Sequence, residues 1–254
     1  MELNIKLAPE LTPVWQLWIG TPNIAELACE KTVKTVYSRD KGYQYIKLLW
    51  KDLPDSLKSL KGRAKAQTAD VVRFWLLAKY GGVWFDSDII ARKEIPFRLW
   101  LKSNKDAIIH INHSVNDINW ASNGGLACNA GNITMQKVFD ISKETYEKKG
   151  ALAWTGCGPQ VLTNVLKTGS GNELSLAWKE WAHEWTNSDA QKRYRYPMTP
   201  TVQKCLNLSG NWYYAHVTGA GIKQHAKRKT LADDKTVFCR LLAFVYNELG
   251  LELK

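Results

Sequence analysis

The chain has 254 residues, with 35 Lys and Arg against 24 Asp and Glu, and 45% of it is apolar. This composition excludes disordered, collagen-like and low-complexity classes, and the length is enough to bury a substantial core. No stretch approaches the ~18 apolar residues of a membrane span, and no basic start leads into an apolar run. We therefore expect a cytoplasmic protein without a transmembrane segment. The five Cys form no C-x-x-C pair, which predicts reduced, mostly buried thiols.

The net charge of +11 is concentrated in three windows without acidic residues, 56–69, 190–204 and 219–232. They hold 12 of the 35 cationic residues, so the remaining 23 nearly balance the 24 acidic ones. A patchy surplus of this kind favours an anionic partner over general solubility.

Hydrophobic spacing predicts strands that alternate with helices along the chain. The expected strands are 14–19, 43–50, 83–85 and 107–111. The expected helices are 23–38, 65–80, 132–148, 159–168, 174–185 and 233–249. This order predicts an α/β fold with a mostly parallel sheet flanked by helices, a more helical C-terminal half, and one domain over residues 1–254.

The segment that follows helix 65–80 carries the chemistry. It reads Gly81-Gly82-Val83-Trp84-Phe85-Asp86-Ser87-Asp88. Two carboxylates two positions apart on extended backbone project to the same side and suit Mg²⁺ or Mn²⁺. The alternative is a solvated turn.

Asp70 and Arg73 lie on the preceding helix. They are three apart and face the same side, which is also the spacing of a simple helical ion pair.

Taken together, the run from Ala69-Asp70-Val71-Val72-Arg73 to Asp88 closely resembles the pattern of DXD-motif glycosyltransferases. These include yeast initiating mannosyltransferases, bacterial capsular polysaccharide sugar transferases and clostridial glucosylating toxins. Three shorter segments are similar to other motifs of that family. They are Pro13 to Gly20 (opening strand), Leu49-Trp50-Lys51-Asp52 (L-W-x-D) and Thr155-Gly156-Cys157-Gly158-Pro159 (a T-G-P turn with two residues inserted).

The resemblance implies a GT-A fold and retaining transfer from a nucleotide sugar, UDP-linked by preference, with Mn²⁺ or Mg²⁺. Residues 13–125 would form the donor-binding core and 126–254 the acceptor-side and closing elements. Asp86, Asp88 and Arg73 would be catalytic, and Trp18 would lie against the base. The residues assigned to donor binding are Trp18, Ile19, Gly20, Asp70, Arg73, Gly82, Asp86 and Ser87.

The resemblance also implies a third metal ligand beside Asp86 and Asp88. Trp212-Tyr213-Tyr214-Ala215-His216 is similar to a strand that ends in His in family members. The Ser-Trp expected after it is replaced by Gly219-Ala220-Gly221-Ile222, so a core histidine is an equal alternative for His216.

The basic windows bear on the acceptor. Lys192, Arg193, Tyr194 and Arg195 interleave cations with aromatics, as proteins that track a phosphate backbone do. A second cluster follows at Lys223, Lys227, Arg228 and Lys229. They favour DNA as acceptor, with a hydroxymethylated pyrimidine of the kind found in phage genomes as the expected base.

Other functions remain open at this stage. The acceptor could be a polysaccharide, a lipid or a protein, and a solvated basic rim would then explain the charge. A non-catalytic nucleic-acid-binding protein would leave Asp86 and Asp88 without a role. A glycoside hydrolase needs carboxylates on opposite sides of the scissile bond, which neighbouring strand positions do not offer. The oligomeric state is not readable.

Overall fold

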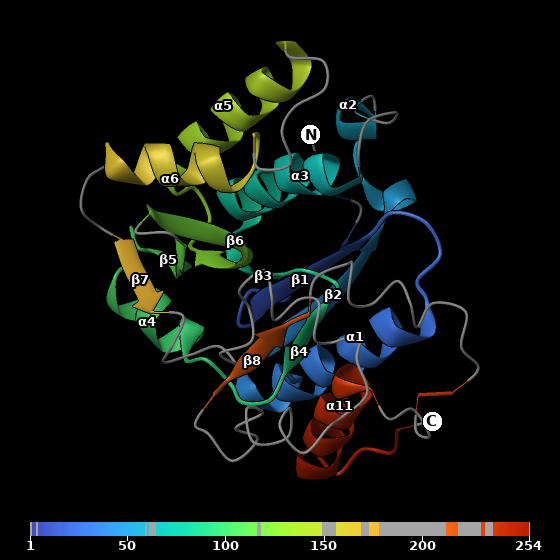
Figure 1. The fold of residues 1–254 in the computed structure, drawn as a ribbon. Helices are drawn as coiled ribbons and strands as arrows, with labels where there is room; N and C mark the ends of the chain where they lie inside the picture. Colours follow the sequence, from blue (N-terminus) through green and yellow to red (C-terminus); the bar gives the residue numbers. More distant parts are fainter. Residues whose placement is uncertain are drawn as a thin grey trace. The chain divides into compact units, whose positions relative to one another are not determined.

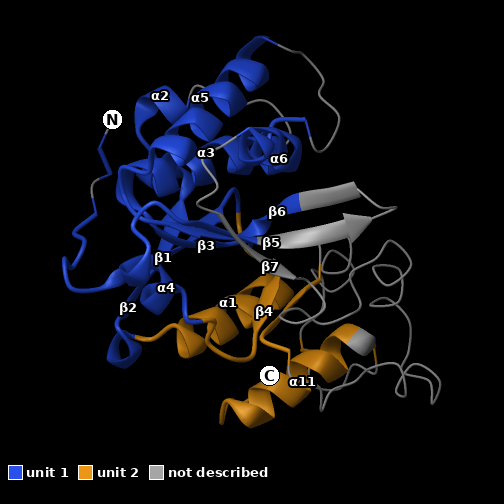
Figure 2. Cartoon of the chain, turned by 90° about the vertical axis from the view of Figure 1, so that its left-hand side faces the viewer, with its two compact units in different colours: residues 1–20, 39–86, 96–177 blue, residues 21–38, 87–95, 178–254 orange. Residues whose placement is uncertain are grey.

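The computed structural model describes residues 2, 3, 5–58, 60, 65–115, 118–148, 156–168, 173–177, 212–217, 230, 231 and 236–253 (Figure 1). The chain divides into two compact units (Figure 2). The first comprises 1–20, 39–86 and 96–177, and the second comprises 21–38, 87–95 and 178–254. Whether they act as the single domain expected above stays a prediction.

The first unit contains a mixed six-stranded sheet. Its strands are β1 (Thr12–Trp18), β2 (Tyr43–Leu49), β3 (Gly82–Phe85), β5 (Ile108–Val115), β6 (Ile118–Cys128) and β7 (Glu173–Ala177), in the order β2-β1-β3-β6-β5-β7. β1 runs parallel to β2 and β3, and β5 runs parallel to β7. β6 is antiparallel to both of its neighbours. The expected α/β fold with a mostly parallel sheet is confirmed.

Helices cover the sheet. Those of the first unit are α2 (Asp55–Lys58), α3 (Lys65–Tyr80), α4 (Phe97–Ser103), α5 (Ile133–Lys148) and α6 (Pro159–Lys167), with 3₁₀ turns at Arg39–Lys41 and Trp50–Asp52. Figure 1 shows α3, α5 and α6 together on one side of the sheet. The helices expected at 65–80, 132–148 and 159–168 are therefore confirmed.

One expected helix is wrong over its described part. Residues 173–177, expected to open the helix 174–185, form β7 instead, in parallel register with β5 from Ile108↔Glu173 to Asn112↔Ala177. The segment Glu-Leu-Ser-Leu-Ala alternates polar and apolar residues, as a strand does. Its backbone groups form hydrogen bonds with the edge of β5, and this pairing favours the strand over a helix. Residues 178–185 lie outside the described part of the chain.

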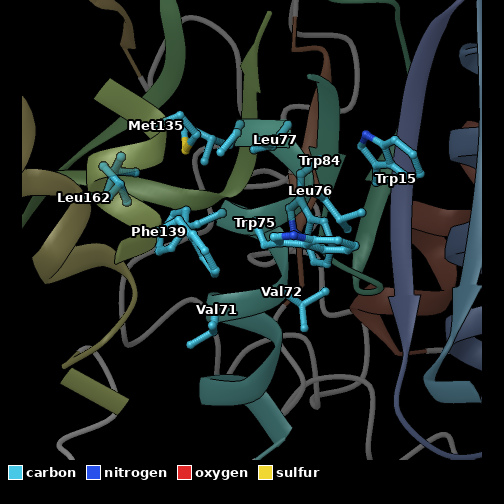
Figure 3. Packing of buried hydrophobic residues seen from close by; sticks show 14 of the residues in the cluster. Trp15, Val71, Val72, Trp75, Leu76, Leu77, Trp84, Met135, Phe139 and Leu162 are labelled. Atoms are coloured by element: carbon cyan, nitrogen blue, oxygen red, sulfur yellow. The ribbon is translucent and has the colours of Figure 1, made fainter. Parts of the chain in front are cut away.

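Helix α3 is buried on most of its surface, because α5 and the sheet pack against it. Its apolar residues join the core of the first unit with Trp15 and Trp84 (Figure 3). The Trp15 indole donates to the Gly81 carbonyl oxygen at 2.8 Å. Gly81 has φ of +64°, and its N–H donates to the Leu77 carbonyl oxygen at 2.9 Å, so it ends the helix as expected.

The second unit has a core of its own. Its described elements are α1 (Ile24–Val36), β4 (Ile89–Ala91), β8 (Tyr214–His216) and α11 (Val237–Glu248). Asn23 and Glu26 form a capping box at the start of α1. β4 and β8 pair in antiparallel fashion, and their side chains pack with α1 and α11 around Cys29, Ile90 and Phe238.

In the described residues, no helix combines the length and apolar character that crossing a membrane requires. Four of the five cysteines are described, and all four are buried thiols, as expected: Cys29, Cys128, Cys157 and Cys239.

Candidate functional site

A buried arginine joins two carboxylates at the carboxyl end of β3. Arg73 Nη2 lies 3.0 Å from Asp70 Oδ1 and 3.0 Å from Asp86 Oδ1. The side chains of Arg73 and Asp70 are only 4% and 7% exposed, and that of Asp86 is 22% exposed. Trp84 supports both partners of the second pair: its ring lies 5.0 Å from Arg73 Cζ and its indole donates to Asp86 Oδ1 at 2.9 Å. The helical pair Asp70 and Arg73 is thus part of a larger site.

The backbone of Asp86 is held from two neighbouring strands. Gln16 of β1 is fully buried and donates its amide to the Asp86 carbonyl oxygen at 3.0 Å. Tyr45 of β2 in turn donates its hydroxyl to Gln16 Oε1 at 2.9 Å. On the other side, the Asp86 N–H donates to the Gly124 carbonyl oxygen at 2.9 Å. These bonds fix where the carboxyl ends of β1 and β3 meet, the edge at which α/β sheets bind ligands.

Asn123 of β6 completes the surroundings of Asp70. Its side-chain amide donates to Asp70 Oδ1 at 2.7 Å, and its backbone carbonyl oxygen accepts a hydrogen bond from Arg73 Nη1. The pKa of the Asp70 carboxyl is raised to about 6, because burial and the Asp86 charge raise it more than Arg73 and the hydrogen bonds from Asn123 and Cys157 lower it. A carboxyl with such a pKa can exchange its proton near neutral pH.

In the second unit, Asp88 lies directly before β4 and His216 ends β8. Ile89 pairs with His216 in the register of the two strands, and the Val217 N–H donates to the Asp88 carbonyl oxygen at 3.0 Å. This pairing brings His216 Nε2 to 3.1 Å from Asp88 Oδ1. Both side chains keep some exposure, 18% for His216 and 13% for Asp88. The strand expected to end in His216 is confirmed.

The predicted base-contacting residue is largely buried. Trp18 at the end of β1 is 4% exposed, and Lys47 Nζ lies 4.6 Å from its ring centroid. In the described part of the chain, its indole N–H has no hydrogen-bond partner. Contact with a base stays a prediction.

Glycines at strand ends allow close approach. Gly20 has φ of +107°, and a side chain there would meet Lys65 Nζ at 3.1 Å. Gly82 has φ of +95°, and a Cβ would lie 2.3 Å from the Pro13 carbonyl oxygen, so glycine lets β3 start against β1. Ile19 and Ser87 are half-buried, and their assigned roles stay predictions.

The residues predicted to contact an acceptor lie outside the described part of the chain. They are Lys192, Arg193, Tyr194, Arg195, Lys223, Lys227, Arg228 and Lys229. In the first basic window, Lys58 pairs with Asp55 at 3.0 Å.

Three residues near the site were missed by sequence reasoning: Gln16, Lys47 and Asn123. Gln16 and Asn123 each interrupt an apolar strand, and a polar residue pointing into a core is a signal that could have drawn attention to them. Asn123 is also followed by Gly124 and Gly125, an unusual pattern in a strand interior. Lys47 shows no such signal.

Chemically, Asp86, Asp88 and His216 offer oxygen and imidazole ligands. Carboxylate oxygens and a neutral imidazole nitrogen suit Mn²⁺, and the carboxylates suit Mg²⁺. Asp88 and His216 already present one ligand atom each within 3.1 Å of the other. Asp86 precedes Asp88 by two residues, so chain connectivity keeps their Cα atoms within about 7 Å. The residues therefore fit a divalent cation.

A family model described as capsular polysaccharide synthesis protein matches residues 5–153, more than half of the chain. The chain belongs to this family. The matched region includes Asp70, Arg73, Asp86 and Asp88, which are the residues of the DXD segment. A search of curated proteins finds no significant match.

Solved glycosyltransferases share the fold of this family member. One is involved in glycosylation of the major capsid of PBCV-1 (TM-score 0.53, 11% identity, 84% of this chain and 98% of that one). Another is the bifunctional WbbM (TM-score 0.56, 11% identity), and the match covers 96% of this chain and 51% of that one. A third is GlyE of Streptococcus pneumoniae TIGR4 (TM-score 0.51, 10% identity), and the match covers 94% of this chain and 62% of that one.

The chain thus spans about half of WbbM and less than two thirds of GlyE. At these identities the likeness shows the fold alone. Family and fold together place the chain among the glycosyltransferases of GT-A type, and the expected enzyme class is confirmed.

Proposed function

We propose that this family member is a metal-dependent, retaining glycosyltransferase that takes its sugar from a nucleotide sugar, UDP-linked by preference. The observation that carries the proposal is the pairing of Asp88 with His216 at 3.1 Å, two residues after an Asp86 that is tied to Arg73. A chance D-x-D in a solvated turn has no reason to pair with a histidine about 130 residues further along the chain.

Asp88, His216 and Asp86 would hold the cation. A bound Mn²⁺ or Mg²⁺ supplies Lewis-acid stabilisation of the charge on a departing diphosphate. The Ile89↔His216 register places the imidazole, and Trp84 and Arg73 orient the Asp86 carboxylate. The core-histidine alternative is less suited to His216, because its side chain keeps 18% exposure and faces a carboxylate.

Arg73 and Asp70 would bind and orient the donor. Arg73 is rigid, because two carboxylates, a carbonyl oxygen and the Trp84 ring surround its guanidinium. A preorganised cation of this kind stabilises developing negative charge without reorganising. The Asp70 carboxylate offers an acceptor to sugar hydroxyl groups, and the Asn123 amide holds that carboxylate at 2.7 Å. We assign none of these side chains as a covalent nucleophile.

A saccharide is the acceptor favoured by the family, whose name refers to capsular polysaccharide synthesis. The four buried thiols are in keeping with a reducing, cytoplasmic location for the reaction.

DNA is the second candidate acceptor, and one observation favours it. The surplus of positive over negative charge is concentrated in three acid-free windows, two of which lie beyond residue 153, outside the part that the family model matches. Phosphate neutralisation by such windows would supply sequence-independent affinity for a modified phage-type DNA.

Transfer of radiolabelled sugar from a panel of nucleotide sugars tests both acceptors, in Mn²⁺ and in EDTA. Label on oligosaccharide or lipid-linked saccharide supports the first, and label on hydroxymethylated DNA supports the second. No label on any acceptor, with no release of nucleoside diphosphate, would contradict the proposal. Unchanged activity of Asp88→Ala would instead favour a non-catalytic protein.

A further inference from the structure

Gly158 approaches Asp70 more closely than any residue with a side chain could. Gly158 is the N-cap residue of α6, and a Cβ built on it would lie 2.3 Å from Asp70 Oδ2 and 2.7 Å from Asn123 Nδ2. Carbon atoms in van der Waals contact are ~3.5–4.0 Å apart, so a side chain would displace both groups. Its φ of −109° lies outside the left-handed region, and the Asp70 carboxylate leaves no room for a side chain.

The two oxygens of Asp70 are fixed by different means. Oδ1 accepts from Asn123 Nδ2 at 2.7 Å and pairs with Arg73 Nη2 at 3.0 Å. Oδ2 faces the turn, where Cys157 Sγ lies 3.9 Å away and Gly158 leaves room for it. Asp70 is 5% exposed, so the carboxylate has no alternative position in solvent.

The position of the Asp70 carboxylate also affects the ion pair between Arg73 and Asp86. Arg73 Nη2 bridges Asp70 Oδ1 and Asp86 Oδ1, and Nη1 donates to the Asn123 carbonyl oxygen. A rotation of the Asp70 carboxylate would therefore move the guanidinium or leave it with one carboxylate. Planar, forked donors depend on such geometry.

We propose that the Cys157-Gly158 turn, together with Asn123, positions the Asp70 carboxylate and through it the Arg73 guanidinium at the donor site. Gly158 and Asn123 are positioning residues for the proposed sugar transfer, and this inference rests on that proposed function. Because Gly158 has no side chain, the turn leaves space for the Asp70 carboxylate.

The first test compares Gly158→Ala with Gly131→Ala. Gly131 has φ of +74° and open space around it, so its substitution strains the backbone without contacting the site. We expect Gly158→Ala to lower kcat/KM for the nucleotide sugar about 100-fold, since a misplacement near 1 Å has effects of that order. The KM for the acceptor should stay unchanged, and Gly131→Ala should keep wild-type kinetics while its Tm falls.

A second variant keeps the test decisive if Gly158→Ala does not fold. Asn123→Asp keeps the shape but places two carboxylates against each other, and they need a shared proton. The other groups that act on Asp70 are Arg73, Asp86 and Cys157. We expect donor-dependent activity of Asn123→Asp to fall as pH rises from 5 to 8, relative to wild type.

Each outcome has one meaning. Wild-type donor kinetics for Gly158→Ala, or a wild-type pH profile for Asn123→Asp, would overturn the inference and leave the proposed function standing. Absence of transfer and of UDP binding in the wild-type protein, measured by calorimetry with Mn²⁺, would overturn the proposed function itself.

Discussion

Arg73 and Asp86 form an ion pair at 3.0 Å between the end of β3 and helix α3. The same guanidinium also pairs with Asp70, so one cation compensates two carboxylates in the core of the first unit. Removing the guanidinium leaves both without compensation. We expect Arg73→Ala to lower the free energy of unfolding by about 3–5 kcal/mol, as for other broken buried pairs.

Urea unfolding of Arg73→Ala and of Arg39→Ala measures this effect. Arg39 is a matched control, because its pair with Glu10 spans 3.7 Å between side chains that are 79% and 63% exposed. Exposed pairs contribute about 0–1 kcal/mol, so equal losses in the two variants would show that Arg73 is not a buried charge centre.

His216 should be required for metal affinity. Its Nε2 lies 3.1 Å from Asp88 Oδ1, and a ligand's removal should cost at least as much as the roughly 10- to 100-fold typical of residues that only orient ligands. We expect His216→Ala to weaken Mn²⁺ binding by about tenfold or more, measured by electron paramagnetic resonance. Wild-type affinity in this variant, with Asp88→Asn also unaffected, would exclude the proposed ligand set.

Stability should depend on pH through Asp70. Burial raises its pKa from 3.8 to about 6, so between these values the folded state holds a proton that the unfolded state has released. The contribution of Asp70 is therefore fully present below pH 3.8, falls as pH rises, and levels off above pH 6, by on the order of 3 kcal/mol in all.

Urea unfolding at pH 4 and pH 7 without divalent cations checks this sign. The loss between the two pH values should be larger in wild type than in Asp70→Asn, which has no such titration. An equal loss in both would show that Asp70 does not titrate with a raised pKa.

Arg92 should support the second unit from within its core. Its guanidinium pairs with Glu248 of α11, with 2.6 Å from Nε to Oε2 and 2.9 Å from Nη2 to Oε1, and its Cζ lies 4.7 Å from the Trp212 ring centroid. We expect Arg92→Ala to cost about 1.5–3 kcal/mol, the range for hydrogen bonds to charged groups.

Glu248→Gln serves as the control for Arg92. It keeps an acceptor oxygen for Arg92 and leaves Trp212 covered, so its Tm should fall less. A larger fall for Glu248→Gln than for Arg92→Ala would contradict the importance of the buried guanidinium.

The sequence was sufficient for the elements whose pattern is local. Helix α3 and β3 follow from periodicity and from Gly81, and Asp86 and Asp88 stand out because carboxylates follow an apolar strand. The strand ending in His216 was found by resemblance. Long-range pairing was harder to predict. β7 is a strand through its pairing with β5, and the polar–apolar alternation of its five residues is too short to decide between a strand and a helix.

The contacts that the supporting residues make with Asp70 could not be predicted for the same reason. Asn123 meets Asp70 across 53 positions, and Gly158 meets it across 88. Neither spacing has a local pattern, and only the packing of β6 and α6 around α3 brings these residues together. The pairing of Asp88 with His216 also lacks a local pattern, because it depends on the register between β4 and β8.

Metal-dependent cleavage of a nucleotide sugar tests the central claim most directly, because it needs no knowledge of the acceptor. Release of nucleoside diphosphate would be measured with Mn²⁺ and with EDTA for wild type, Asp88→Asn and the control Asp55→Asn, whose side chain is 97% exposed. The account predicts release by wild type and Asp55→Asn in Mn²⁺ only, and none above background by Asp88→Asn with an unchanged Tm. Equal release by Asp88→Asn, or release that persists in EDTA, would contradict it.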